Sequence, residues 1–400
     1  MLEVLHSATR SLQHEGEYGN WATTIKESDY RLLSRAWSYQ ERMLSPRIIH
    51  FGPNCEAFWS KNYGAEYRHI NEAIPYLDSE IRTGISEDGD YAGRTNVANS
   101  HKGKFPIERA RRMLVSLMDE KPSRSQLLEP LGSLGKYEGR SNPDLKIELL
   151  RKTWHCIIDE FTRLNITFAM DRLPALSGLA SAITAPFQPL YDRNINLPTP
   201  MYLAGIWSNC LPYSLLWTCS PNSRRTSKYR APTFSWASVE GAATFQTPLT
   251  AGTKKGDPVK AGFIEVVGWT GNATVIAVGS TSTGENGTRG IIEQDQRKPD
   301  SKESSTKRQE FYLDISPCLR KKESVEVTAG DEVLVLLIES EKTIRYGYRV
   351  MALILRFTEQ QRAYQRVGLI CPDIQYVEGY QDLFLWPSGW FPEKRTVKIT

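Results

Sequence analysis

The stretch Leu32–Gly52, LLSRAWSYQERMLSPRIIHFG, changes its hydrophobic period halfway along. Its first half has the spacing of an amphipathic helix. The side predicted to be apolar carries Leu33, Ala36, Trp37, Gln40 and Leu44, and it is adjoined by Leu32, Tyr39 and Met43. Pro46 has no backbone N–H and disfavours helix in the residue before it, so the helix should end there. The runs RIIHFG and CEAFWS that follow predict two short strands joined by a turn.

Trp37 and Glu41 lie four residues apart and are therefore neighbours on the predicted helix. If the Trp37 ring is buried, Glu41 stands at the border of the apolar face. A partly desolvated carboxylate there could stabilise a developing positive charge. The alternative is an ordinary surface glutamate that pairs with Arg42 or Arg47. The sequence leaves both interpretations open.

The bulk composition narrows the functional class. With 400 residues, 40% of them apolar and 24% charged, we expect a globular protein of two or three cooperating parts. A net charge of +4 is too small to indicate a nucleic-acid partner. The longest apolar runs, such as EVLVLLIE, have the length of strands, so no membrane span is expected. The scattered cysteines and the absence of a signal pattern predict a reduced, cytoplasmic protein. The cysteines and histidines do not have the spacing of metal ligands, so no metal site is expected, and no cofactor is expected either.

Further along, the pattern is helical up to about residue 220 and then changes to strands. The sequence predicts helices over 106–120, 144–164 and 171–184, and a further, bent helix over 200–219. It predicts loops over 75–103 and 123–143. After Tyr229 short β-rich runs alternate with turns. Between two of them the polar residues 280–309 should be disordered. We therefore expect an α+β fold, with a helical middle region packed against a C-terminal β-rich domain.

Several of these blocks resemble a known family. SRAWSYQERMLSPRIIHFG resembles the closing block of the fungal HET (heterokaryon incompatibility) domain, which reads WTLQE, then LLSPR and a hydrophobic strand. DRLPALSGLA, YLAGIWSNCLPYSLLW and RAPTFSWASVEG resemble blocks that follow HET domains, in the same order, and YQRVGLICP and KRTVKIT fit the end of that layout. The matching positions in the first block are Arg35, Trp37, Gln40, Glu41, Pro46 and Arg47.

The resemblance implies a domain division. HET domains are similar to the flavodoxin-like TIR class, but their first strand, their glycine–tryptophan turn and their D-x-x-C-I-x-Q segment have no counterpart here. Residues 1–62 are therefore expected to be the end of a HET domain whose beginning is missing. Residues 63–144 should be a loop-rich connection with one helix, 145–228 a helical region, and 229–400 the β-rich domain.

Two functional hypotheses follow from the resemblance. The first is a non-catalytic protein of fungal non-self recognition and regulated cell death, acting through protein partners, with a homo- or hetero-oligomer as one option. The second is a TIR-like NAD hydrolase that uses Glu41 and is completed by the missing sequence or by a partner chain. Nucleotide sites of doubly wound sheets form at strand ends that this chain lacks, which favours the first. A degenerate fragment without activity is the third possibility.

Other residues admit two interpretations each. Asp171 and Arg172 could bind a ligand, although helix capping and an internal salt bridge explain them as well. Three tryptophans in apolar runs could form a sugar platform, but core packing is favoured for Trp207, Trp217 and Trp236. His155 and Cys156 could be half of a nucleophilic pair, but adjacent helical residues face different directions.

Overall fold

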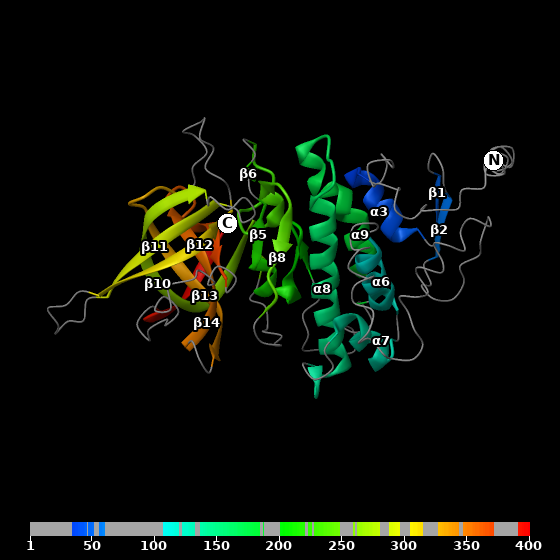
Figure 1. The fold of residues 1–400 in the computed structure, drawn as a ribbon, viewed down its shortest axis with the longest axis horizontal. Helices are drawn as coiled ribbons and strands as arrows, with labels where there is room; N and C mark the ends of the chain where they lie inside the picture. The colour runs from blue at the N-terminus through cyan, green and yellow to red at the C-terminus, as the bar shows by residue number, and fades with distance from the viewer. Residues whose placement is uncertain are drawn as a thin grey trace, which may run out of the picture.

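The computed structural model describes only part of the chain. The described residues are 34–45, 47–51, 56–60, 107–119, 122–132, 137–184, 187, 201–220, 223–225, 228–248, 259–260, 262–280, 288–296, 305–314, 327–343, 347–371 and 391–400. The loop predicted over 75–103 and Pro46 lie outside them. Figure 1 shows helices at one end, short strands beside them and a large antiparallel sheet at the other end. The expected mixture of helices and strands in an α+β fold is confirmed.

The helices gather around one long buried helix, α8 (Asn142–Thr162). Its first turn is fixed by Ser141, whose hydroxyl accepts a hydrogen bond from the Asp144 backbone N–H. Buried residues, several of them polar, cover most of its circumference, as expected for a helix enclosed on several sides. The helices around it are α3 (Ala36–Leu44), α6 (Ile107–Met118), α7 (Arg124–Leu128) and α9 (Pro174–Thr184). The predicted helices over 106–120, 144–164 and 171–184 are thus confirmed, and α7 lies in a stretch predicted to be a loop.

The helix predicted over 200–219 is wrong. This segment forms short strands separated by 3-10 turns: β3 (Tyr202–Leu203), β4 (Ile206–Trp207) and β5 (Trp217–Cys219). Between β3 and β4, Ala204 and Gly205 both have positive φ, which closes a tight hairpin. The segment is buried on several sides, and for such short apolar runs periodicity does not separate strand from helix. The predicted helical region 145–228 is therefore helical only in its first part.

Three further short strands follow, and together with β3, β4 and β5 they are called the middle layer below. They are β6 (Arg224–Arg225), β7 (Val239–Glu240) and β8 (Ala243–Phe245), with β5 paired to β8 and β6 paired to β7. Figure 1 shows β5, β6 and β8 between α8 and the large sheet. At the other end of the molecule, the two strands predicted after Pro46 are confirmed as the antiparallel pair β1 (Arg47–Phe51) and β2 (Glu56–Ser60).

The large sheet closes on itself. Antiparallel pairings join β10 to β11, β11 to β12, β12 to β15, β15 to β14, β14 to β13, and β13 back to β10. The strands of this ring are β10 (Phe263–Ser280), β11 (Thr288–Gln296), β12 (Ser305–Leu313), β13 (Glu332–Thr343), β14 (Gly347–Thr358) and β15 (Ala363–Ile370). The short β9 (Val259–Lys260) and β16 (Glu393–Ile399) add to β10. A closed ring leaves no unpaired edge among its members.

The disorder predicted over 280–309 is wrong for the described part of that range, because residues 288–296 and 305–309 pair in β11 and β12. The polar composition that suggested disorder belongs in part to exposed strand positions, such as Arg308, whose Nε lies 3.1 Å from Glu293 Oε1. Buried Ile292 and Phe311 alternate with these polar residues.

Two hydrophobic cores result. One fills the ring of strands, where the Phe311 ring takes the space that a side chain at Gly290 would need: a Cβ there would lie 2.3 Å from the ring. The other core is shared by the helices, the middle strands and the outer wall of the ring. Thr233 N bonds the carbonyl oxygen of Thr400 at 2.9 Å, which ties the C-terminal residue to the middle layer.

Candidate functional site

The helix α3, which carries the motif residues, is held to the rest of the helical layer by side-chain packing and by the main chain. It buries Ala36, Tyr39 and Met43. Ala36 N bonds the Asn165 carbonyl oxygen at 3.0 Å, and Asn165 N bonds the Ser34 carbonyl oxygen at 2.7 Å. Arg35, between these bonds, is exposed, and its side chain makes no capping bond to the helix. The side chain of Arg47, at the start of β1, lies outside the described residues.

The structure places Trp37 differently from the prediction. Its side chain was expected to be buried, but Trp37 is 45% exposed. The indole Nε1 donates a hydrogen bond to Asp171 Oδ2 at 3.0 Å, so two of the predicted site residues do come together. Glu41, one turn further along α3, is exposed. The partly desolvated position that catalysis by Glu41 would need is therefore not seen.

Gln40 joins α3 to α9. Its Oε1 accepts hydrogen bonds from Gly178 N at 3.0 Å and Leu179 N at 3.4 Å. Gly178 permits this approach, because a Cβ at this position would lie 2.7 Å from Gln40 Nε2. The glycine of the block DRLPALSGLA is thus explained by the close contact with the motif glutamine.

Asp171 and Arg172 connect α3 to the middle strands. They lie in the 3-10 turn Ala169–Arg172 that precedes α9. Arg172 is buried, its guanidinium lies 5.3 Å from the centroid of the Trp236 ring, and its Nη2 donates to the Gly241 carbonyl oxygen at 2.6 Å. Burial, followed by the neighbouring charge of Arg230, lowers the pKa of Arg172 to about 10. The partners that hold Arg172 are therefore an aromatic ring and a carbonyl group.

The three predicted core tryptophans are indeed core residues. Trp207, Trp217 and Trp236 are 1%, 0% and 0% exposed, which rules out an open sugar platform. The Gly205 carbonyl oxygen accepts hydrogen bonds from both Trp236 Nε1, at 2.9 Å, and Trp154 Nε1, at 2.8 Å. One carbonyl group of the β3–β4 hairpin thus anchors two indoles from different layers.

A half-buried polar cluster that the sequence did not predict lies between α3, α8 and α6. Glu160 Oε2 accepts a hydrogen bond from the Tyr39 hydroxyl at 2.7 Å, and Oε1 lies 3.6 Å from the Cys156 thiol. The Ala110 backbone N–H of α6 also bonds this carboxylate. Burial raises the pKa of Glu160 to about 7, against the lowering effect of these hydrogen bonds. The only sign in the sequence was an acidic residue beside Phe161 in an apolar stretch.

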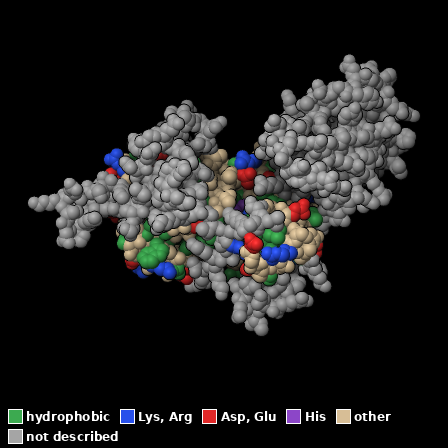
Figure 2. Space-filling view, turned by 60° about the horizontal axis from the view of Figure 1, so that its bottom comes forward, with side chains coloured by type: hydrophobic (Ala, Val, Ile, Leu, Met, Phe, Trp, Pro, Cys, Tyr) green, Lys and Arg blue, Asp and Glu red, His purple; other side chains and the backbone are tan. Residues whose placement is uncertain are grey.

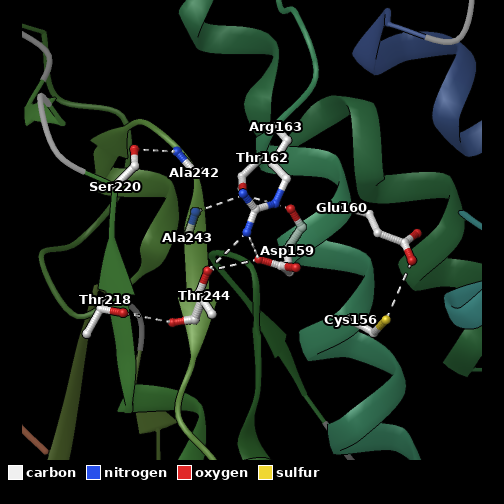
Figure 3. Close-up of polar contacts among 10 residues, drawn as sticks. All are labelled: Cys156, Asp159, Glu160, Thr162, Arg163, Thr218, Ser220, Ala242, Ala243 and Thr244. Atoms are coloured by element: carbon white, nitrogen blue, oxygen red, sulfur yellow. Dashed lines mark hydrogen bonds and ion pairs between the residues drawn. The ribbon is translucent and has the colours of Figure 1, made fainter. Parts of the chain in front are cut away.

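The opposite side of α8 faces the middle strands (Figure 3). Thr162 Oγ1 accepts a hydrogen bond from Ala243 N at 2.9 Å, and the Thr244 hydroxyl donates to Asp159 Oδ1 at 2.9 Å. Arg163 pairs with the same Asp159 oxygen at 2.7 Å. In the same view Cys156 and Glu160 point away from β8.

His155 also faces the middle strands, so it and Cys156 point in different directions, as predicted. Its ring stacks on Phe245 at 3.8 Å, and its Nε2 lies 3.0 Å from the Ser214 hydroxyl. Burial, followed by the charge of Arg151, holds the pKa of His155 well below its usual range. His155 is 8% exposed and Ser214 is 1% exposed, so this serine–histidine pair is closed to a substrate.

The described residues contain no group of three His, Cys, Asp or Glu side chains that could hold a metal ion. Nor does any helix in the described part of the chain have the length and apolar character needed to cross a membrane. In comparisons with protein-family models, curated proteins and solved structures, nothing matches this chain.

Proposed function

We propose that this chain is an interaction protein of the heterokaryon-incompatibility type, acting in fungal non-self recognition and regulated cell death without catalysis of its own. The supporting observation is that four blocks of the resemblance meet in one place. The first meets the second through Trp37–Asp171 and Gln40–Gly178. The second meets the fourth through Arg172–Trp236, and the fourth meets the third through Trp236–Gly205. In this proposal the motif residues serve the assembly of a recognition surface.

Exposed apolar side chains beside this junction support protein contacts. Trp37, Phe168 and Met170 are 45%, 68% and 53% exposed, and the last two lie within three residues of Asp171. Aromatic residues and methionine are enriched in the cores of protein interfaces. Figure 2 shows acidic and basic side chains close together on the part of the described surface that is visible in that view.

The position of Glu41 argues against hydrolysis of NAD. A carboxylate stabilises an oxocarbenium-like centre only when the substrate is held against it, and positioning of this kind supplies about 7–11 kcal/mol. Glu41 lies exposed on α3, where water solvates its charge. We therefore expect Glu41→Gln to leave the function of the chain intact.

The test is expression of the chain in a filamentous fungus, with growth arrest as the readout. We expect arrest with the natural sequence and with Glu41→Gln, and its loss with Phe168→Asp and Met170→Asp. Phe357→Asp is the matched control, because Phe357 is 51% exposed but lies on the ring of strands. Release of nicotinamide from NAD by the purified chain, abolished by Glu41→Gln, would refute the proposal and favour the hydrolase.

A further inference from the structure

A buried ion pair lies between the ring of strands and the middle layer. Asp314, directly after β12, and Arg366, on β15, are 1% and 0% exposed. Arg366 Nη2 lies 3.1 Å from Asp314 Oδ1, and it also donates to the Trp217 carbonyl oxygen. The guanidinium carbon of Arg366 lies 3.5 Å from the centroid of the Trp217 ring. Arg366 is thus held from two sides, by Trp217 of β5 and by the carboxylate that follows β12.

Positive charge exceeds negative charge around this pair. Arg225 Nη2 lies 3.7 Å from Asp314 Oδ2 and donates to the Arg366 carbonyl oxygen at 2.8 Å. Against the effect of burial, which raises the pKa of the Cys219 thiol, the charges of both Arg366 and the buried Arg172 lower it, so both guanidiniums lie near this thiol. Arg366 and Arg225 therefore share one buried carboxylate, and Arg172 adds a third positive charge near Cys219.

A second carboxylate, that of Glu240, acts on this group of charges. Glu240 raises the pKa of Arg172 against the lowering effect of burial, but its Oε2 also lies 2.6 Å from the exposed Arg224, so its charge is shared between the two guanidiniums. Burial lowers the pKa of Arg366, and it lowers those of Arg172 and Arg225 to about 10. The direction is the same for all three, as expected where desolvated cations lack sufficient negative charge.

Several guanidinium N–H groups have unmet hydrogen-bonding capacity. Arg366 Nε, Arg366 Nη1 and Arg172 Nε are buried and have no hydrogen-bond partner among the described residues. A buried donor without a partner costs about 1–3 kcal/mol, and more when it belongs to a charged group. Unmet donors together with excess positive charge are the chemistry of an anion site.

We propose that a small monovalent anion, of the size of chloride or formate, binds beside Arg366 between β5 and β15. The anion accepts hydrogen bonds from Arg366 and offsets the charge that Asp314 alone leaves uncompensated. Arg366 is 0% exposed, so a site beside it excludes nucleotides and acidic polymers and leaves only small ions as candidates. This inference is independent of the proposed function.

The first test is thermal unfolding of the full chain in sodium chloride and in sodium gluconate at equal ionic strength, because gluconate is too large for an enclosed site. We expect the melting temperature to be higher in chloride by about 2–3 °C at a concentration near one hundred times Kd. Asp314→Asn removes the competing carboxylate, so the difference between the two salts should grow. Glu359→Gln, which removes an exposed negative charge, is the matched control and should leave the difference unchanged.

The second test needs no variant. Crystals of the chain soaked in sodium bromide should show an anomalous peak within hydrogen-bond distance of Arg366. Equal melting temperatures in chloride and gluconate, or ordered water alone beside Arg366, would overturn the proposal. A bromide peak without a salt-specific effect in solution would also overturn it, because the ion would then be adventitious. If Asp314→Asn does not fold, the natural chain in both tests decides.

Discussion

The Glu160 cluster should make the attachment of α3 depend on pH. Glu160 receives hydrogen bonds from Tyr39 of α3, from Cys156 of its own helix and from the Ala110 backbone of α6. The negative charge of Asp159 raises the pKa of Glu160 further, and Arg42 lies 5.9 Å from the ring of its partner Tyr39. No salt bridge to Glu160 is found within the described residues. Ionisation therefore places a poorly compensated charge at the point where three helices meet.

The magnitude follows from the pKa. In the folded chain the pKa of Glu160 is about 7, against an ordinary value of 4.5. A raised pKa means that the folded state favours the protonated form, so this contribution is fully present below pH 4.5 and is lost as the pH rises through 7. A shift of 2.5 units, from 7 minus 4.5, corresponds to about 3 kcal/mol. Because the side chain keeps some contact with solvent, we expect about 2 kcal/mol.

The assay is urea unfolding of the natural chain and of Glu160→Gln at several values between pH 4 and pH 8. The substituted amide would remain uncharged at every pH and would still accept a hydrogen bond from Tyr39. The two free energies of unfolding should agree near pH 4, and the variant should be more stable by about 2 kcal/mol at pH 8. Taking the difference cancels the titration of His155 and other groups common to both chains. Glu41→Gln, on the exposed side of α3, is the control for the loss of one charge.

Hydrogen exchange locates the effect. Backbone amides of α3 should lose protection in the natural chain as the pH rises from 6 to 8, after correction for the intrinsic exchange rate, and should keep it in Glu160→Gln. Amides of β13 and β14 serve as the internal reference. A difference in stability that stays constant from pH 5 to pH 8, or a loss of protection shared equally by the strands, would refute this reasoning.

Three further predictions concern two closely packed glycines and one buried histidine. Gly178→Ala should destabilise the chain by about 1–3 kcal/mol in urea unfolding, because its Cβ would lie 2.7 Å from Gln40. Gln40→Ala in the same chain should recover part of that loss, and an additive double variant would contradict the contact. His155→Gln should reduce the loss of stability on acidification. The pKa of His155 is lowered, so its contribution is present above pH 6.5 and lost below it, and an unchanged acid limb would contradict this. Gly290→Ala should lower the melting temperature markedly, because its Cβ would lie 2.3 Å from Phe311, and Phe311→Leu should restore it in part.

The helices were predictable where one residue pattern was sustained. The segment 144–164 repeats apolar residues over several turns, and Ser141 marks its start with a capping hydroxyl. The antiparallel pair after Pro46 was predictable from two short β-rich runs flanking a turn. In each case the local preference and the tertiary environment agree, so no long-range information was needed.

Local preference failed where distant residues decide the structure. The 200–219 segment is apolar on several sides because α8 and the ring of strands enclose it, and this burial removes the period that would distinguish helix from strand. The hairpin of β11 and β12 is polar on the outside, and its pairing with β10 and β15 closes the ring. The enclosure of the 200–219 segment and the closure of the ring cannot be predicted from local sequence, because both depend on strands far along the chain.

The prediction for α3 failed for a narrower reason, and that reason bears on Glu41. Placing Trp37 in the core assumed that the largest apolar side chain marks the buried face, whereas the buried positions are Ala36, Tyr39 and Met43. This face is turned by about one residue, or about 100°, from the predicted one. Tyr39 occupies it because its hydroxyl finds Glu160, while the Trp37 indole reaches Asp171 at the rim. A turn of this size carries Glu41 away from the core and into solvent. The catalytic hypothesis rested on the spacing of Trp37 and Glu41. Both residues lie on the exposed side of α3, and Tyr39 lies on its buried side.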